Sequence, residues 1–127
     1  MKPETSIKAL LVLITAVILF HLNIVFKIIP YDITWGGRLQ NDSEMYVFEF
    51  ISISINLFLG WVLLMKGGFI KPFFGERTIR VTLLAYFALF VLNTVGNIFA
   101  KTSFEKSFSL LTLIFAILIL VLLRNKR

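Results

Sequence analysis

The clearest chemically useful side chain in this sequence is the carboxylate of Glu49. It stands inside the apolar run 45–65, where an acid can bind a cation, accept a proton or act as a general acid or base. Amides recur in the other apolar runs, at Asn23, Asn56, Asn93 and Asn97. Glu49 and these four amides are therefore our main candidates for a ligand-binding site.

Two further candidates, Trp35 and Arg38, flank the Gly36-Gly37 dipeptide that precedes this run. A Gly-Gly pair permits positive φ and a tight turn, which would put the indole and the guanidinium on either side of a reversal. The planar guanidinium could clamp a carboxylate or phosphate, or it could pair with an acid nearby in the loop. The indole could contact a ligand or serve as an interfacial anchor.

Several chemistries are excluded by what the sequence lacks. With no cysteine and a single histidine, His21, it lacks the ligands for a structural zinc and the two histidines that would ligate a haem. It also lacks a thiol nucleophile. It also has no glycine motif for phosphates or dinucleotides, no His-Glu-x-x-His and no Gly-x-Ser-x-Gly. We therefore assign no catalytic residue, metal or cofactor, and we favour a role other than catalysis.

Composition and hydropathy define the elements that must position these residues. The 127 residues are 58% hydrophobic and 16% charged, and four apolar runs occupy 7–29, 45–65, 79–100 and 107–123, with an outer loop at 30–44. Each run falls in the range of about 17 to 25 residues that spans a bilayer as a helix. We expect Pro30 to end the first helix, Asp42 or Ser43 to cap the second, and Gly67-Gly68 to end it. The prediction is an all-α polytopic membrane protein, a four-transmembrane-helix bundle forming one domain, 1–127.

Basic residues set the expected orientation. Nine of the 13 Lys and Arg fall at the face that holds both termini, and the other four are mixed with acids at the opposite face. By the positive-inside rule we expect both termini in the cytoplasm and a multi-pass protein of the cell membrane. This distribution of basic residues fits a bacterial plasma membrane. Because topology and anionic lipid explain the net charge of +6, we expect membrane lipids and no nucleic acid as partners.

Counting from each helix centre places the polar residues in one layer. At about 1.5 Å per residue, Asn23 lies about 8 Å, Glu49 about 9 Å, and Asn93 and Asn97 about 5 to 11 Å outward of the middle. Helical spacing also puts Met45, Glu49, Ser52 and Asn56 on one stripe, and Tyr86, Asn93 and Asn97 on another. Polar groups in a membrane face the bundle or water, so we expect a pocket open to the outer side.

The first span carries polar residues on two different faces. Asn23 and Lys27 share one face, whereas His21 lies about 200° from Asn23 and is expected to point elsewhere. Lys27 could therefore pair with Glu49, which would make the acid structural. The amides could likewise be interhelical hydrogen bonds, and the stripe Ser109, Thr112 and Ala116 suits close helix packing.

The runs Trp35 to Leu39 and Glu44 to Glu49 resemble small four-span bacterial membrane proteins of unassigned function, over about the first half of the chain. In layout the chain is also similar to the sterol-isomerase and sigma-2 receptor superfamily, whose bundles hold a membrane-embedded acidic pocket. A second buried acid, which that resemblance implies, is missing from the predicted third and fourth spans. Small multidrug transporters are less similar, because their essential acid lies in the first span, whereas the predicted first span of this chain contains no acid.

Three functions remain open. The first is a bundle that binds, or helps to move, a small lipophilic or cationic ligand through Glu49, the amides and the outer loop. The second is an intramembrane lipid-modifying enzyme or isomerase with Glu49 as its acid/base. The third is an accessory or assembly subunit, as a homo-oligomer or in a larger membrane complex, whose polar layer is only structural. We favour the first.

Overall fold

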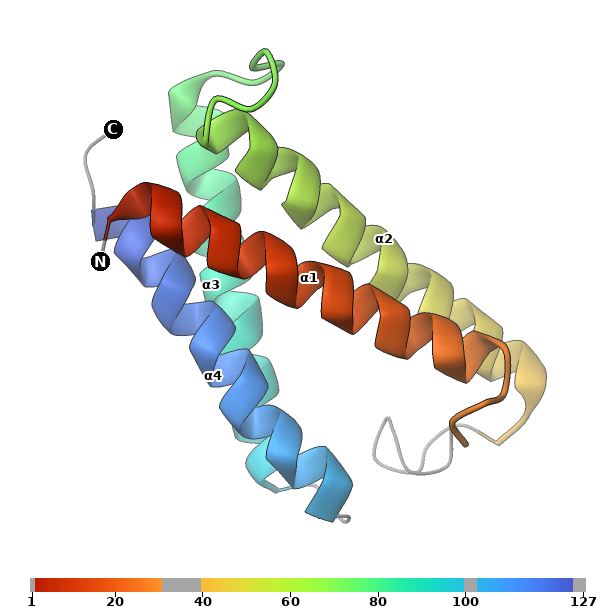
Figure 1. The fold of residues 1–127 in the computed structure, drawn as a ribbon. Helices are drawn as coiled ribbons and strands as arrows, with labels where there is room; N and C mark the ends of the chain where they lie inside the picture. The colour runs from red at the N-terminus through yellow and green to blue at the C-terminus, as the bar shows by residue number, and fades with distance from the viewer. Residues whose placement is uncertain (1, 31–39, 100–102, 125–127) are drawn as a thin grey trace.

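The computed structural model describes residues 2–30, 40–99 and 103–124, which form four helices (Figure 1). These are α1 (Pro3–Val25), α2 (Asp42–Lys66), α3 (Glu76–Ile98) and α4 (Ser103–Arg124). All four are long and apolar enough to cross a membrane, which confirms the all-α class and the number of predicted helices. Trp35, Arg38 and the Gly36-Gly37 turn proposed for the outer loop lie outside the described residues.

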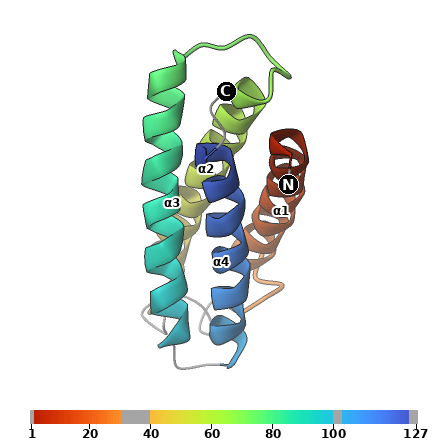
Figure 2. The same cartoon turned by 90° about the vertical axis from the view of Figure 1, so that its left-hand side faces the viewer.

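The helices form two pairs that diverge toward one end (Figures 1 and 2). α3 and α4 make the most extensive contact, α1 and α2 the next, and α2 touches α3 only sparingly. We call the end with the start of α1, the α2–α3 connection and the end of α4 the terminal end. The other end, where α1 stops and α2 starts, is called the open end.

The terminal end is closed by packing and by hydrogen bonds between helices. Ser6 Oγ on α1 donates to the carbonyl of Leu118 on α4 at 2.8 Å, and Tyr86 Oη on α3 donates to the carbonyl of Ile55 on α2 at 2.7 Å. An apolar core surrounds these bonds, with contributions from every helix: Leu10, Ile14, Leu59, Leu63, Leu83, Ile119 and Leu122. Because these contacts tie all four helices together, the terminal end forms the base from which the pairs diverge.

The small-residue stripe predicted to suit close helix packing meets α3 through Thr112. Ala116 is buried, and the hydroxyl of Thr112 lies 2.8 Å from that of Thr94 on α3. Phe90 and Phe115 stack beside them with ring centroids 4.6 Å apart and planes 6° from parallel. Small side chains let the backbones approach, so this pair is the most closely joined part of the bundle.

α1 ends at Val25, before Pro30, so the predicted end is wrong. Lys27 adopts a left-handed backbone with φ 61°, its N–H donates to the carbonyl of Ile24 at 2.9 Å, and the N–H of Ile28 donates to the carbonyl of Asn23 at 2.8 Å. This is a Schellman motif with lysine where glycine is usual. The same motif ends α2 at Gly68, with φ 76°, as the Gly-Gly pair predicted.

The start of α2 also differs by one residue from the prediction. Asn41, rather than Asp42 or Ser43, is the N-cap, and its Oδ1 accepts from the N–H of Glu44 at 2.9 Å. The Glu44 carboxylate in turn accepts from the N–H of Gln40 at 3.0 Å, in a variant of the capping box. These two bonds fix the direction in which α2 leaves the loop.

Candidate functional site

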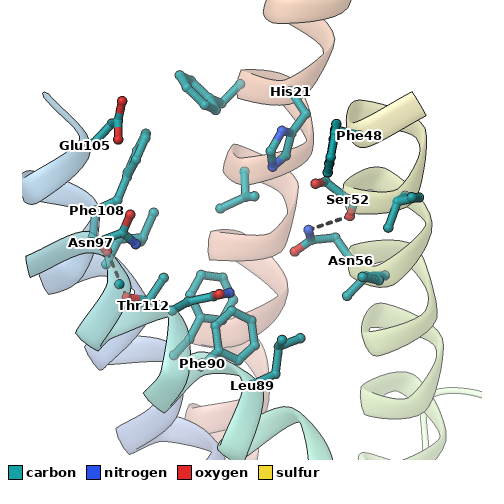
Figure 3. A pocket seen from close by; sticks show the side chains of 18 of the residues that line it. His21, Phe48, Ser52, Asn56, Leu89, Phe90, Asn97, Glu105, Phe108 and Thr112 are labelled. Atoms are coloured by element: carbon teal, nitrogen blue, oxygen red, sulfur yellow. Dashed lines mark hydrogen bonds between the residues drawn. The ribbon is translucent and has the colours of Figure 1, made fainter. Parts of the chain in front are cut away.

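A cavity of about 1070 Å³ lies between the two helix pairs in the half toward the open end (Figure 3). All four helices line it. Its polar lining consists of His21, Glu49, Ser52, Asn56, Asn93, Asn97, Glu105 and Thr112, and its aromatic lining of Phe20, Phe48, Phe90, Phe99, Phe108 and Phe115. The cavity exists because the pairs separate here, whereas at the terminal end apolar side chains fill the same space.

Glu49 is the buried centre of the polar lining. Its side chain is 0% exposed, and its Oε2 forms a hydrogen bond with Nδ1 of His21, which is 15% exposed. The expectation that His21 points away from Glu49 is therefore wrong. α1 is rotated so that its histidine, and not its Asn23–Lys27 face, meets α2.

Lys27 forms its salt bridge with an acid other than Glu49. Its ammonium pairs with the carboxylate of Asp42, and both side chains are about half exposed at the open end, beyond the cavity. This ion pair joins the Schellman turn at the end of α1 to the start of α2. The proposed Lys27–Glu49 pair, which would have made Glu49 purely structural, is not formed.

Asn23 is not part of the cavity lining. Its Nδ2 donates to the carbonyl of Leu19 on its own helix at 2.8 Å. The expectation that Asn23 faces Glu49 is therefore wrong, for the same reason that brings His21 inward. Two residues separated by about 200° on one helix cannot both face one narrow space.

The predicted stripe on α2 is buried along its whole length. Met45 and Glu49 are fully enclosed, and Ser52 and Asn56 are 8% and 9% exposed. Asn56 Nδ2 donates to the carbonyl of Ser52 at 2.8 Å, and its amide extends into the space between the pairs (Figure 3). The structure thus brings Asn56 and Glu49 to the same wall of the cavity.

The side-chain amides of α3 form a more exposed wall of the cavity. Asn93 is exposed and Asn97 half-buried, and both line the cavity. Tyr86, on the same predicted stripe, is buried nearer the terminal end, where its hydroxyl is held by Ile55. The stripe therefore faces inward near the base and becomes more exposed where α3 diverges from α2.

Glu105 is the lining residue that the sequence analysis missed. It lies in the first turn of α4, is 4% exposed and lines the cavity on the wall opposite His21 (Figure 3). We predicted that the fourth span starts at Ser107 and that it contributes no buried acid; both expectations are wrong because α4 starts at Ser103. The run Thr102-x-x-Glu105 matches a capping box, and it could have shown the earlier start.

The charge of the lining follows from these positions. Glu49 and Glu105 are its carboxylates, His21 is its only titratable base, and no lysine or arginine lines it among the described residues. The lining therefore holds more acidic than basic side chains. No three His, Asp or Glu side chains in the described part of the chain are grouped so that they could hold a metal ion. The arrangement suits an organic cation with apolar groups.

Comparison with known proteins adds no assignment. No protein-family model matches the chain, and no curated protein or solved structure is significantly similar to it. The function is therefore inferred from the geometry and charge of the cavity.

Proposed function

We propose that this chain is an integral membrane protein that binds a small lipophilic cation, or helps to move one, through the cavity between its helix pairs. In this proposal the four helices span a bacterial plasma membrane with both termini in the cytoplasm. Seven described basic residues at the terminal end favour this orientation: Lys2, Lys8, Lys66, Lys71, Arg77, Arg80 and Arg124. The cavity then opens toward the outer side.

The observation that carries the proposal is the acidic, aromatic lining of the cavity. A buried carboxylate in a membrane is costly unless it has a partner or a function, and its attraction for a cation is strong where water is excluded. Phenylalanine faces add a favourable interaction with a cation and a surface for its apolar groups. Carboxylates on α2 and α4 with rings between them therefore favour cations over anions of equal size.

The His21–Glu49 bond gives this site a reversible partner. In the absence of ligand, the imidazole satisfies one oxygen of Glu49. A bound cation can share the carboxylate or take the place of the imidazole, so the acid need never be left buried and alone. The cavity volume of about 1070 Å³ is slightly above the range of about 300 to 1,000 Å³ typical for small-ligand sites.

Binding of matched lipophilic ions tests this proposal. Tetraphenylphosphonium and tetraphenylborate have nearly the same size and opposite charge, so their difference isolates the sign of the cavity charge. We expect the purified chain in lipid nanodiscs to bind the cation at least about tenfold more tightly than it binds the anion. Both affinities are measured relative to empty nanodiscs. Glu49→Gln should remove most of this preference, since it keeps the shape of the side chain and removes its charge.

Glu76→Gln is the matched control, because Glu76 is an exposed acid in the first turn of α3 at the terminal end. It should leave the preference unchanged. Equal binding of both ions by the wild type would overturn the proposal. Tolerance of Glu49→Gln, together with a protein that co-purifies in stoichiometric amount, would instead favour the accessory-subunit function.

A second function is favoured by one observation, the imidazole–carboxylate pair facing a cavity. Such a pair can take a proton from one carbon of a lipophilic substrate and return it to another, which is the reaction of an isomerase. Incubation with membrane lipids in deuterated water tests this function. Deuterium in a recovered lipid, lost in both Glu49→Gln and His21→Asn, would establish it.

A further inference from the structure

A second hollow lies in the opposite half of α3 and α4, at the terminal end. It has a volume of about 530 Å³ and is lined by Arg77, Arg80 and Arg124, with Val81, Leu84 and Leu120 among its apolar residues. We call it the α3–α4 groove. It shares no lining residue with the cavity around Glu49.

The three arginines converge from two helices. Arg77 and Arg80 are one turn apart on α3, so they lie on one face, and Arg124 is the last residue of α4. Arg80 Nη1 donates to the carbonyl of Leu123 at 2.6 Å, which holds this guanidinium against the C-terminal turn of α4. That bond satisfies one of the carbonyls that a helix end leaves open.

None of the three arginines forms a salt bridge with a described residue, although Glu76 precedes them in the first turn of α3. Within residues 2–30, 40–99 and 103–124, the salt bridges are His21–Glu49 and Lys27–Asp42, both at the other end of the bundle. Arg77 and Arg124 are exposed, and their guanidiniums have donors to spare. Converging arginines with free donors match the oxygens of a phosphate, which they can bind in bidentate fashion.

The apolar side of the groove continues toward the middle of the helices. Val81 and Leu84 on α3 are 58% and 56% exposed, and Leu120 on α4 is 38% exposed. These apolar residues lie about one helical turn closer to the bundle centre than the arginines do. Charge at the end of the helices and an apolar channel beside it are the two parts of a phospholipid site. A free phosphate would use only the first part.

We propose that the α3–α4 groove binds one anionic phospholipid. Arg77 and Arg124 bind its phosphate, Arg80 on α3 adds charge from its fixed position against the end of α4, and an acyl chain lies along Val81, Leu84 and Leu120. This site is separate from the cation cavity and needs only the membrane insertion of the proposed function. In the proposed orientation it faces the cytoplasmic leaflet, whose anionic lipids attract basic groups.

Native mass spectrometry of the full chain released from detergent tests the site, with phosphatidylglycerol and phosphatidylcholine of equal chain length as probes. We expect one phosphatidylglycerol to be retained at least about tenfold more strongly than phosphatidylcholine. Each basic side chain near an anionic lipid contributes a factor of about five, so Arg77→Gln and Arg124→Gln should each weaken retention about fivefold and together about 25-fold. Arg80 is left intact because it also holds α4.

Lys8→Gln is the matched control, since Lys8 is exposed on α1 at the same end but does not line the groove. It should change retention less than twofold. Equal retention of both lipids, or an equal loss in Lys8→Gln, would overturn the proposal. Displacement of the lipid by millimolar inorganic phosphate would show an anion site that ignores the acyl chain, and would also overturn it.

Vesicle flotation separates this test from the proposed function. Wild type and both arginine variants should float with the vesicles, because the four apolar helices are unchanged. Flotation without selective lipid retention would count against the groove alone. Failure of the wild type to float would count against membrane insertion, and so against both proposals.

Discussion

The hydrogen bond between His21 and Glu49 should couple α1 to α2 measurably. At the open end, α1 meets α2 through this bond, through the exposed Lys27–Asp42 pair and through a small apolar cluster around Ile24. A double-mutant cycle with Glu49→Leu and His21→Leu isolates the bond, because leucine fits the apolar surroundings and forms no hydrogen bond. The cycle removes the single-site effects of each change on helix packing.

The expected coupling follows from burial. Hydrogen bonds to charged groups contribute about 1.5 to 3 kcal/mol in soluble proteins. Interhelical side-chain bonds in membranes average about 0.6 and reach about 1.7 kcal/mol. Since Glu49 is 0% and His21 15% exposed, the bond belongs near the top of the membrane range. We expect about 1.5 kcal/mol, a factor of roughly twelve in the unfolding equilibrium.

Reversible unfolding in mixed detergent–lipid micelles, followed by circular dichroism, gives the free energies. The chain supplies its own control in Lys27→Met and Asp42→Asn, whose side chains are 54% and 47% exposed. Exposed ion pairs contribute little, so this second cycle should give about 0.5 kcal/mol or less. A His21–Glu49 coupling no larger than the Lys27–Asp42 coupling would refute the assignment of a buried, structurally significant pair.

Three further predictions concern the helix ends and the α3 amides. Lys27→Gly should raise the free energy of unfolding by about 1 kcal/mol and Gly68→Ala should lower it by a similar amount, because both positions have positive φ; a loss in Lys27→Gly would contradict this. Asn41→Ala should cost about 1 kcal/mol and Asn41→Ser much less, since serine keeps the cap acceptor; equal losses in both variants would count against the cap. Asn93→Leu with Asn97→Leu should change stability by about 0.5 kcal/mol or less, because neither amide forms a hydrogen bond with a described residue, yet it should weaken tetraphenylphosphonium binding; collapse in detergent would show a structural role.

Length and hydropathy were sufficient to predict the four helices. A run of about 20 apolar residues has one stable form in hydrocarbon, because only a helix satisfies its backbone without water. Helix ends were less predictable, since they depend on single residues. The sequence around Lys27 has no glycine to indicate a left-handed turn, whereas Gly67-Gly68 indicated one correctly.

The inward faces of the helices were predictable only where polar residues repeat. α2 carries Glu49, Ser52 and Asn56 in register, so its buried stripe followed from spacing. α1 is apolar on nearly all sides, and in a membrane both the lipid-facing and the bundle-facing surfaces are apolar. Its rotation is set by partners on other helices, so the sequence of α1 alone does not show that His21, and not Asn23, faces Glu49.

The position of the ligand is the most direct measure of the proposed function. Tetraphenylarsonium has the charge and shape of tetraphenylphosphonium, and its arsenic atom can be located by anomalous diffraction from crystals of the full chain grown in lipid. We expect an arsenic peak in the cavity between the Glu49 and Glu105 walls, weakened in Glu49→Gln and unchanged in Glu76→Gln. An empty cavity at saturating ion, with peaks only on the outer surface of the helices, would contradict cation binding at this site.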